Sequence, residues 1–170
     1  MQPLLIDYLR LRRAVGALGV LLPFALLAIA GPRESLSAYY YSPARDVLVG
    51  VLCIVAALLA AYRGHDRGDR ICSATAAVGL VVVALFPTGG ATHAVHLAGA
   101  GLFFAAVVAL CERFGRGGYR PRTFLSLGAV MAAALLAGAP GAPRMLCESV
   151  AVVAFGAEWM VKGRALEAMA

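Results

Sequence analysis

Six long apolar runs occupy most of this chain and constrain its fold more than any other feature. Each is about 20 residues long, the length an α-helix needs to cross the roughly 30 Å hydrocarbon core of a bilayer. Short stretches rich in charge, Pro or Gly separate the runs, which cover residues 11–30, 43–62, 69–86, 92–114, 122–139 and 144–161. We therefore predict an all-α fold, a polytopic membrane bundle of six transmembrane helices that forms a single domain over residues 1–170.

The composition supports this class and excludes a water-soluble globule. Only 14% of the residues are charged, against roughly 25% in soluble domains, and 62% are hydrophobic. So few charged side chains cannot cover a soluble surface. The same composition excludes an intrinsically disordered chain, because disorder requires low hydrophobicity.

The distribution of basic residues predicts the orientation. If the N-terminus is cytoplasmic, the outer connections hold only Arg33, Arg45 and Arg144, and the inner segments hold the other twelve of the 15 basic residues. Those twelve are Arg10, Arg12, Arg13, Arg63, Arg67, Arg70, Arg113, Arg116, Arg120, Arg122, Lys162 and Arg164. Since short cytoplasmic loops are enriched in Lys and Arg, both termini are predicted to be cytoplasmic. Arg outnumbers Lys fourteen to one, which is typical of a GC-rich bacterial genome and therefore favours a bacterial inner membrane.

Small residues indicate where the helices approach closely. Glycine and alanine let the backbones of membrane helices come into contact. The positions expected to pack in this way are Gly16, Gly19, Gly50, Gly79, Ala98 and Gly101.

Ionisable and polar side chains gather near the outer ends of the predicted helices. An ionisable group inside a bilayer is costly, so such groups are the first candidates for a functional site. The candidates are Ser37, Tyr41, Arg45, Asp46, His93, His96, Arg144 and Glu148. We expect the first outer loop to fold onto the starts of the fourth and sixth spans and to bring these residues into one polar pocket. Such a pocket would suit an anionic lipid headgroup, which Arg binds through charge-assisted hydrogen bonds.

Metal binding and local pairing are the alternatives for these groups. His93 and His96 share a helix face, but a zinc centre needs a third ligand, for which Asp46 or Glu148 would have to be recruited. We therefore expect no metal and no cofactor, and interhelical hydrogen bonds for the two histidines. Glu148 has Arg144 one helical turn before it, and a local ion pair is the alternative to ligand binding there.

Other charged and sulfur-containing residues have simple expected roles. Glu158 is expected to pair with Lys162 at the i+4 position. The four cysteines lie inside predicted spans without a CxxC pair, so they are expected to be packing residues rather than disulfide or metal ligands.

The chain resembles a family of small bacterial membrane proteins whose activity is not established. The family pattern S-x-S-A-Y-Y-[HY]-x-P-x-R-D is matched by SLSAYYYSPARD at 35–46, and A-x-F-P-T by ALFPT at 84–88. The segment ESVAVVAFGAEWMVKG at 148–163 is similar to the last helix of that family. This resemblance implies a six-helix integral membrane protein.

A more distant resemblance is to the alkaline-ceramidase-like membrane hydrolases, which hold zinc with three histidines. Ser37 and Asp46 stand where that superfamily has a Ser and an Asp, whereas Tyr41 occupies the place of its early His. The pair His93 and His96 is spaced H-x-x-H rather than H-x-x-x-H. This resemblance implies a lipid-directed, metal-dependent hydrolase.

Three classes of function follow from these observations. The first is a non-catalytic membrane component that binds membrane lipids, a partner membrane subunit or a second copy of the chain. The second is a lipid-directed intramembrane hydrolase, and the third is a small transporter. The first is favoured, because enzymes and transporters normally place several polar groups at mid-membrane and the polar groups here lie near the helix ends. Topology accounts for the basic clusters, so no nucleic-acid partner is expected.

Overall fold

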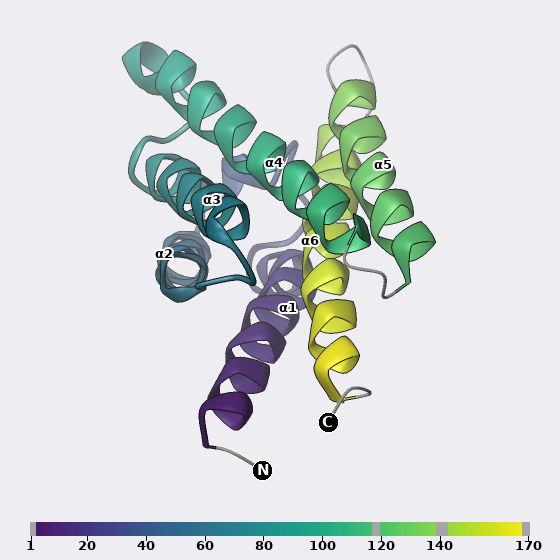
Figure 1. Ribbon diagram of the computed structural model, residues 1–170. Coiled ribbons are helices and arrows are strands. Elements are labelled where there is room, and N and C mark those ends of the chain that lie inside the picture. Colours follow the sequence, from purple (N-terminus) through teal and green to yellow (C-terminus); the bar gives the residue numbers. More distant parts are fainter. Residues whose placement is uncertain (1–2, 117–119, 139–142, 168–170) are drawn as a thin grey trace.

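A computed structural model describes residues 3–116, 120–138 and 143–167. Within these residues it contains six α-helices and two short 3-10 helices (Figure 1). The α-helices are α1 (Pro3–Ala30), α2 (Arg45–Ala61), α3 (Arg67–Leu85), α4 (His93–Arg116), α5 (Pro121–Ala137) and α6 (Arg144–Glu167), and the 3-10 helices are η1 (Ser37–Tyr41) and η2 (Gly90–Thr92). The predicted all-α class is confirmed, with one helix for each apolar run.

Two helices extend beyond their apolar runs. α1 begins at Pro3 rather than at residue 11, and α6 continues to Glu167 rather than ending at residue 161. A hydrophobic run measures the thickness of the hydrocarbon layer, whereas backbone hydrogen bonding continues into the charged flanks. The extensions matter because they bring Tyr8 of α1 against Tyr62, and Lys162 of α6 over the Phe114 ring.

Three helical stretches are long and apolar enough to cross a membrane, namely Tyr8–Ala30, Arg67–Leu85 and Gly90–Arg116. α5 is apolar but shorter, at 17 residues. Large apolar side chains lie on the outside of the bundle, including Leu136, Ile71 and Leu21, which are 76%, 63% and 60% exposed. An outer surface of this kind is unfavourable in water and favourable in lipid, so the fold indicates a membrane protein.

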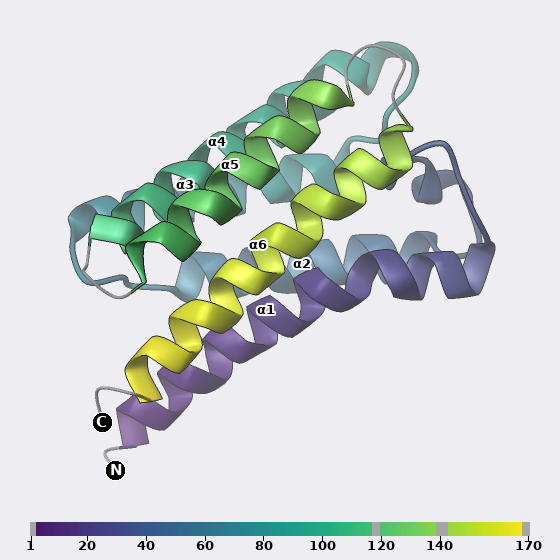
Figure 2. The same cartoon turned by 90° about the vertical axis from the view of Figure 1, so that its right-hand side faces the viewer.

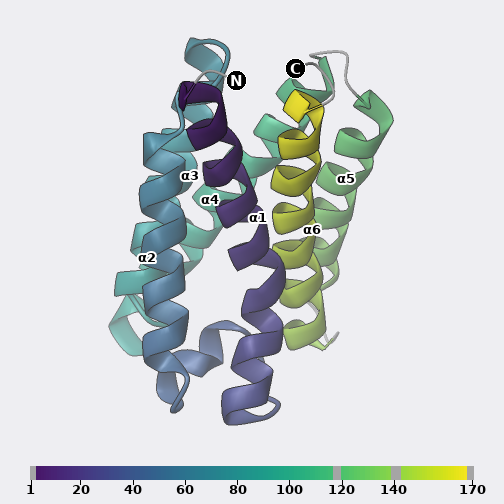
Figure 3. The same cartoon turned by 90° about the horizontal axis from the view of Figure 1, so that it is seen from below.

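The six helices form a closed ring in which each packs on its neighbours in sequence. α2 packs on α3, α3 on α4, α4 on α5 and α5 on α6, and α6 returns to pack along α1. Figures 2 and 3 show α1 and α6 side by side, with the start of α1 and the end of α6 at the same end of the bundle. We call this the terminal end, and the end that carries η1 and η2 the η1 end.

Glycines create the two closest helix contacts. A Cβ atom at Gly79 on α3 would lie 2.6 Å from the backbone nitrogen of Phe103 and 2.7 Å from the carbonyl oxygen of Gly99. On α1, a Cβ atom at Gly16 would lie 2.9 Å from the carbonyl oxygen of Gly156 on α6. The packing prediction therefore holds at these α1 and α3 positions.

The same prediction is wrong at two other glycines. A Cβ atom at Gly50 or Gly101 would meet no atom within 4 Å, and Ala98 is exposed. Counting small residues does not say which face of a helix they occupy. On α4 the helix contact is made by Gly99, whereas Gly101 lies on the open side.

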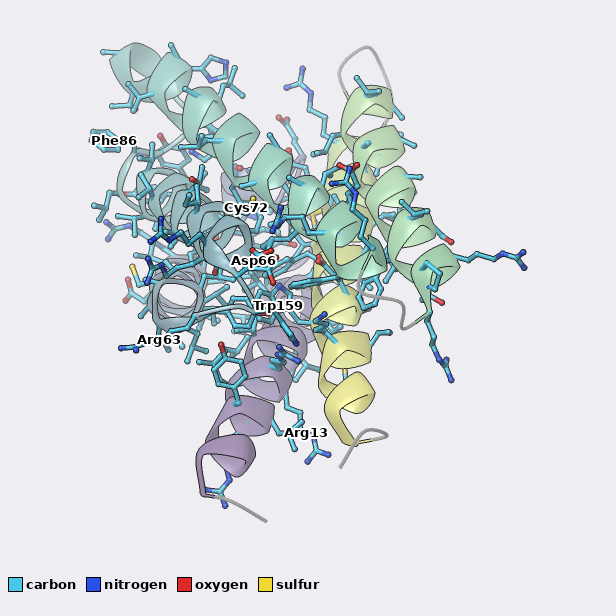
Figure 4. The ribbon with its side chains drawn as sticks, in the orientation of Figure 1. Arg13, Arg63, Asp66, Cys72, Phe86 and Trp159 are labelled. Atoms are coloured by element: carbon cyan, nitrogen blue, oxygen red, sulfur yellow. The ribbon has the colours of Figure 1, made fainter. Side chains whose placement is uncertain are left out.

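Aromatic side chains fill the middle of the ring. The Trp159 ring lies 4.9 Å from that of Tyr62 and 6.1 Å from that of Phe114, and Phe155 stacks edge-on to Phe103 at 5.3 Å. These rings come from the residue after α2 and from α4 and α6, so they tie opposite sides of the ring together. In Figure 4 Trp159 lies among the crowded side chains of the bundle, whereas Arg63 points away from it.

Candidate functional site

The loop between α1 and α2 is folded back onto the η1 end of the bundle. The Tyr39 hydroxyl donates to the Gly31 carbonyl at 2.6 Å, and Tyr39 is fully buried. The Met145 amide at the start of α6 donates to the Glu34 carbonyl at 3.0 Å. These bonds fix the segment that precedes η1 and hold η1 against the bundle.

A serine and a histidine from distant parts of the chain meet at this loop. Ser37 Oγ on η1 lies 3.0 Å from His96 Nε2 on α4, and His96 Nδ1 lies 2.7 Å from the Phe86 carbonyl oxygen at the end of α3. A carbonyl oxygen only accepts, so Nδ1 carries the proton. In neutral His96 the Nε2 atom is then an acceptor, and the Ser37 hydroxyl donates to it. His96 is only 4% exposed, so this chain of hydrogen bonds is shielded from solvent.

Glu148 on α6 fixes the start of η1. Its Oε2 atom accepts the Leu36 amide hydrogen at 2.7 Å. Because the carboxylate is turned toward the loop backbone, it serves as a cap for η1 rather than as an open ligand position. The Leu36 amide, rather than a local ion pair with Arg144, positions Glu148.

The remaining predicted site residues lie at the rim of the same end. Arg45 is exposed at the start of α2, where its Nη2 atom donates to the Tyr40 hydroxyl at 3.1 Å and its guanidinium carbon lies 4.6 Å from the centre of the Tyr40 ring. Tyr41 is 62% exposed, and its hydroxyl reaches the Thr88 carbonyl at 3.4 Å. The other exposed members of the predicted set are Asp46, His93 and Arg144.

The single pocket expected from the sequence is thus two separate groups of residues at one end of the molecule. Ser37, His96 and Glu148 form a buried or half-buried group that anchors the loop. Arg45 and the other exposed residues surround it and face outward. The sequence did not indicate this division, because the partners of His96 and Glu148 are the backbone atoms of Phe86 and Leu36.

The geometry does not favour a metal at the histidines. Both ring nitrogens of His96 are engaged by Ser37 and Phe86. Within the part of the chain that the structure describes, no group of three His, Cys, Asp or Glu side chains is close enough to hold an ion.

At the terminal end, an acidic loop is fastened to α4. Arg113 Nε donates to Asp69 Oδ1 at 2.8 Å, and Arg113 Nη2 donates to Asp66 Oδ2 at 2.6 Å. The Asp66 side chain also caps α3 by accepting the Asp69 amide hydrogen at 2.9 Å. This backbone N–H, together with the Arg113 guanidinium, holds the pKa of Asp66 below its usual range.

A second buried polar group at the terminal end was missed by the sequence analysis. Arg12 and Glu158 are both fully buried. The sequence indicated Arg12 only as one of the basic residues that set the orientation in the membrane. Its spacing to Gly16 and Gly19, four and seven residues on, places all three on one helix face, and this face packs against α6. That spacing is the signal that would have found it.

No family model, curated protein or solved structure matches the chain.

Proposed function

We propose that this chain is a multi-pass bacterial inner-membrane protein that holds an anionic lipid headgroup at the outer side of the bundle. All six helices cross the membrane in this proposal, with the terminal end cytoplasmic and the η1 end outside. The distribution of basic residues supports the orientation, since twelve of the 15 lie on the segments assigned to the inside. We further propose that it belongs to the small six-helix family that it resembles.

The observation that carries the lipid proposal is the fixed position of Arg45. An exposed arginine normally loses side-chain entropy when it binds a ligand. Here the Tyr40 ring and hydroxyl already hold the guanidinium, while η1 is anchored by His96 and Glu148. A preorganised guanidinium binds a phosphate with two parallel hydrogen bonds at less entropic cost. The exposed Tyr41 ring next to it supplies an apolar contact at the headgroup level.

Lipid retention in native mass spectrometry tests this site. We expect Arg45→Ala to weaken retention of a phosphatidylglycerol molecule about tenfold or more, the loss of one charge-assisted hydrogen-bond pair worth about 1.5–3 kcal/mol. Arg33→Ala is the matched control, because Arg33 is an exposed cation in the same loop. Equal losses in the two variants would indicate general electrostatic attraction and would refute a site at Arg45.

The orientation has a separate test. Single cysteines placed at Ser35 and at Arg67, in a background without the native cysteines, should react with a membrane-impermeant maleimide from opposite sides. Reaction of both from outside intact cells would overturn the proposed topology.

The contact between Ser37 and His96 supports a second candidate, a lipid-directed acyl hydrolase. The Ser37 hydroxyl donates to His96 Nε2, and the Phe86 carbonyl orients the ring, which is the relation of a nucleophile to its general base. Attack of Ser37 Oγ on an ester carbonyl would transfer the serine proton to His96, and His96 would return it to the leaving alcohol. Water would then hydrolyse the acyl-serine.

A fluorophosphonate probe decides whether Ser37 is a nucleophile. The candidate requires covalent labelling of Ser37 that is lost in Ser37→Ala and slowed in His96→Ala. Ser42→Ala is the control, because Ser42 lies in the same loop and its hydroxyl donates only to the Tyr39 carbonyl. Absence of labelling in the wild-type protein would eliminate the hydrolase and leave the lipid site unaffected.

A further inference from the structure

Glu158 is the most unusual ionisable group in the bundle. It lies on α6 with none of its surface exposed, neither carboxylate oxygen makes a hydrogen bond of good geometry among the described residues, and its polar neighbour on α4 is the Cys111 thiol. Removing a carboxylate from water without compensating hydrogen bonds is strongly unfavourable. Such groups in membrane proteins are few and mark functional positions.

The expected pair with Lys162 does not satisfy this carboxylate. The Lys162 ammonium lies over the Phe114 ring at 4.2 Å and is 5.9 Å from the Phe124 ring centre. It is therefore held by cation–π contacts, although it remains close enough to act on Glu158 electrostatically.

Unpaired donors accompany the unpaired acceptors. Trp159 Nε1 and Arg12 Nε are buried without a hydrogen-bond partner among the described residues. The rest of the Arg12 guanidinium is fixed, because Nη1 donates to the Lys162 carbonyl and Nη2 to the Tyr62 hydroxyl, each at 3.1 Å. The buried polar atoms at this end of the bundle are thus unpaired among the described residues on both the donor and the acceptor side.

The surrounding charges decide what else the site accepts. The titratable or charged groups that face this region are Tyr8 and Arg12 on α1, Tyr62 at the end of α2, His65 in the loop that follows, Asp69 on α3, Cys111 on α4 and Lys162 on α6. Lys162 brings a positive charge close to Glu158, and Arg12 adds a second one next to Lys162, whose carbonyl it contacts. A metal cation is disfavoured beside two cations, whereas a proton neutralises the carboxylate without needing several oxygen ligands.

We propose that Glu158 is a proton-binding site and that it exchanges protons with the cytoplasmic side. On uptake, a hydronium ion from cytoplasmic water gives its proton to a carboxylate oxygen, an O–H bond forms there, and a water molecule is left. Release reverses the step. The local charge changes by one unit beside Cys111 and Lys162, so proton binding is coupled to the electrostatics of the contact between α4 and α6.

Trp159 provides a direct readout because it is the sole tryptophan of the chain. We expect the Trp159 emission of the protein in lipid nanodiscs to follow a one-proton titration curve, since the neighbouring carboxyl group changes charge. Glu158→Gln should abolish the transition. Glu148→Gln removes a carboxyl group at the other end of α6, and His65→Gln removes a nearby titratable imidazole. Both control variants should retain the transition. Loss of the transition in the His65 variant, or its survival in Glu158→Gln, would overturn the proposal.

A second variant covers the case in which Glu158→Gln does not fold. Lys162→Met keeps the apolar stem over Phe114 and removes the positive charge that opposes protonation of Glu158. The titration midpoint should therefore move to higher pH. An unchanged midpoint would refute the assignment. Infrared spectroscopy gives an independent check, since a carboxylic acid C=O band must appear on the acid side of the midpoint, and its absence would also refute the site.

Discussion

The contact between α3 and α4 allows a quantitative test of the fold, because two glycines on these helices differ only in what lies beside them. A Cβ atom at Gly79 would lie 2.6 Å from the Phe103 nitrogen, whereas one at Gly101 would meet nothing within 4 Å. Both positions are inside helices, so Gly→Ala raises helix propensity at each by up to about 1 kcal/mol. The difference between the two variants isolates the steric cost.

That cost follows from the distances. To restore an ordinary contact of about 3.5 Å at Gly79, α3 and α4 have to separate locally by roughly 0.9 Å, and a gap of this size removes a quarter to a half of the dispersion energy along the contact. Overpacking of this kind typically costs about 1–3 kcal/mol. We therefore expect Gly79→Ala to be less stable than Gly101→Ala by about 1–3 kcal/mol, since the gain in helix propensity is common to both variants and cancels in the difference.

Unfolding followed by Trp159 fluorescence measures this difference. For a chain of this size 1 kcal/mol corresponds to about 2–4 °C in Tm, so the two variants should differ by about 2–12 °C in the same detergent. Gly101→Leu should remain close to wild type, because its side chain enters open space. Midpoints for Gly79→Ala and Gly101→Ala that agree within about 2 °C would refute close packing of α3 on α4.

Two further outcomes are expected at the loops. His96→Ala leaves the Ser37 hydroxyl and the Phe86 carbonyl without their partner, so it should lower the free energy of unfolding by about 1–3 kcal/mol. It should also increase protease cleavage in the first loop, which limited proteolysis will detect. The lowered pKa of Asp66 in the folded protein stabilises the fold at pH values above the ordinary pKa of 3.8, and this contribution is lost as the pH falls through the lower folded-state pKa. Asp66→Asn should therefore lose less thermal stability on acidification than the wild type. Identical acid profiles of the two proteins would contradict this role.

The sequence predicted the parts of the fold that depend on composition and spacing. Apolar runs of membrane length gave the six helices. The approach at Gly79 followed from residue size alone, but Gly101 did not behave as predicted because the facing side of a helix is set by its partners. Arg12 was missed for a similar reason, since a basic residue at a helix end satisfies the topology rule whether it is exposed or buried.

The candidate site was predicted to a similar extent. The sequence placed Ser37 and His96 at one level of the bundle, and the structure brings them to hydrogen-bond distance. It did not indicate that Phe86 and Leu36 complete the arrangement, because backbone donors and acceptors are present at every residue. The spacing on the helix predicted an ion pair between Glu158 and Lys162. Only the tertiary structure shows that aromatic rings engage Lys162 instead.

The closure of the ring by α1 and α6 has a consequence for synthesis of the protein. α1 packs more extensively on α6 than on α2, so α1 meets its main partner only after the four helices between them have been made. Until then the glycine face of α1 and the Arg12 side chain lack the surface that covers them. Chains that stop before α6 should therefore be cleaved by proteases more readily than chains that contain it.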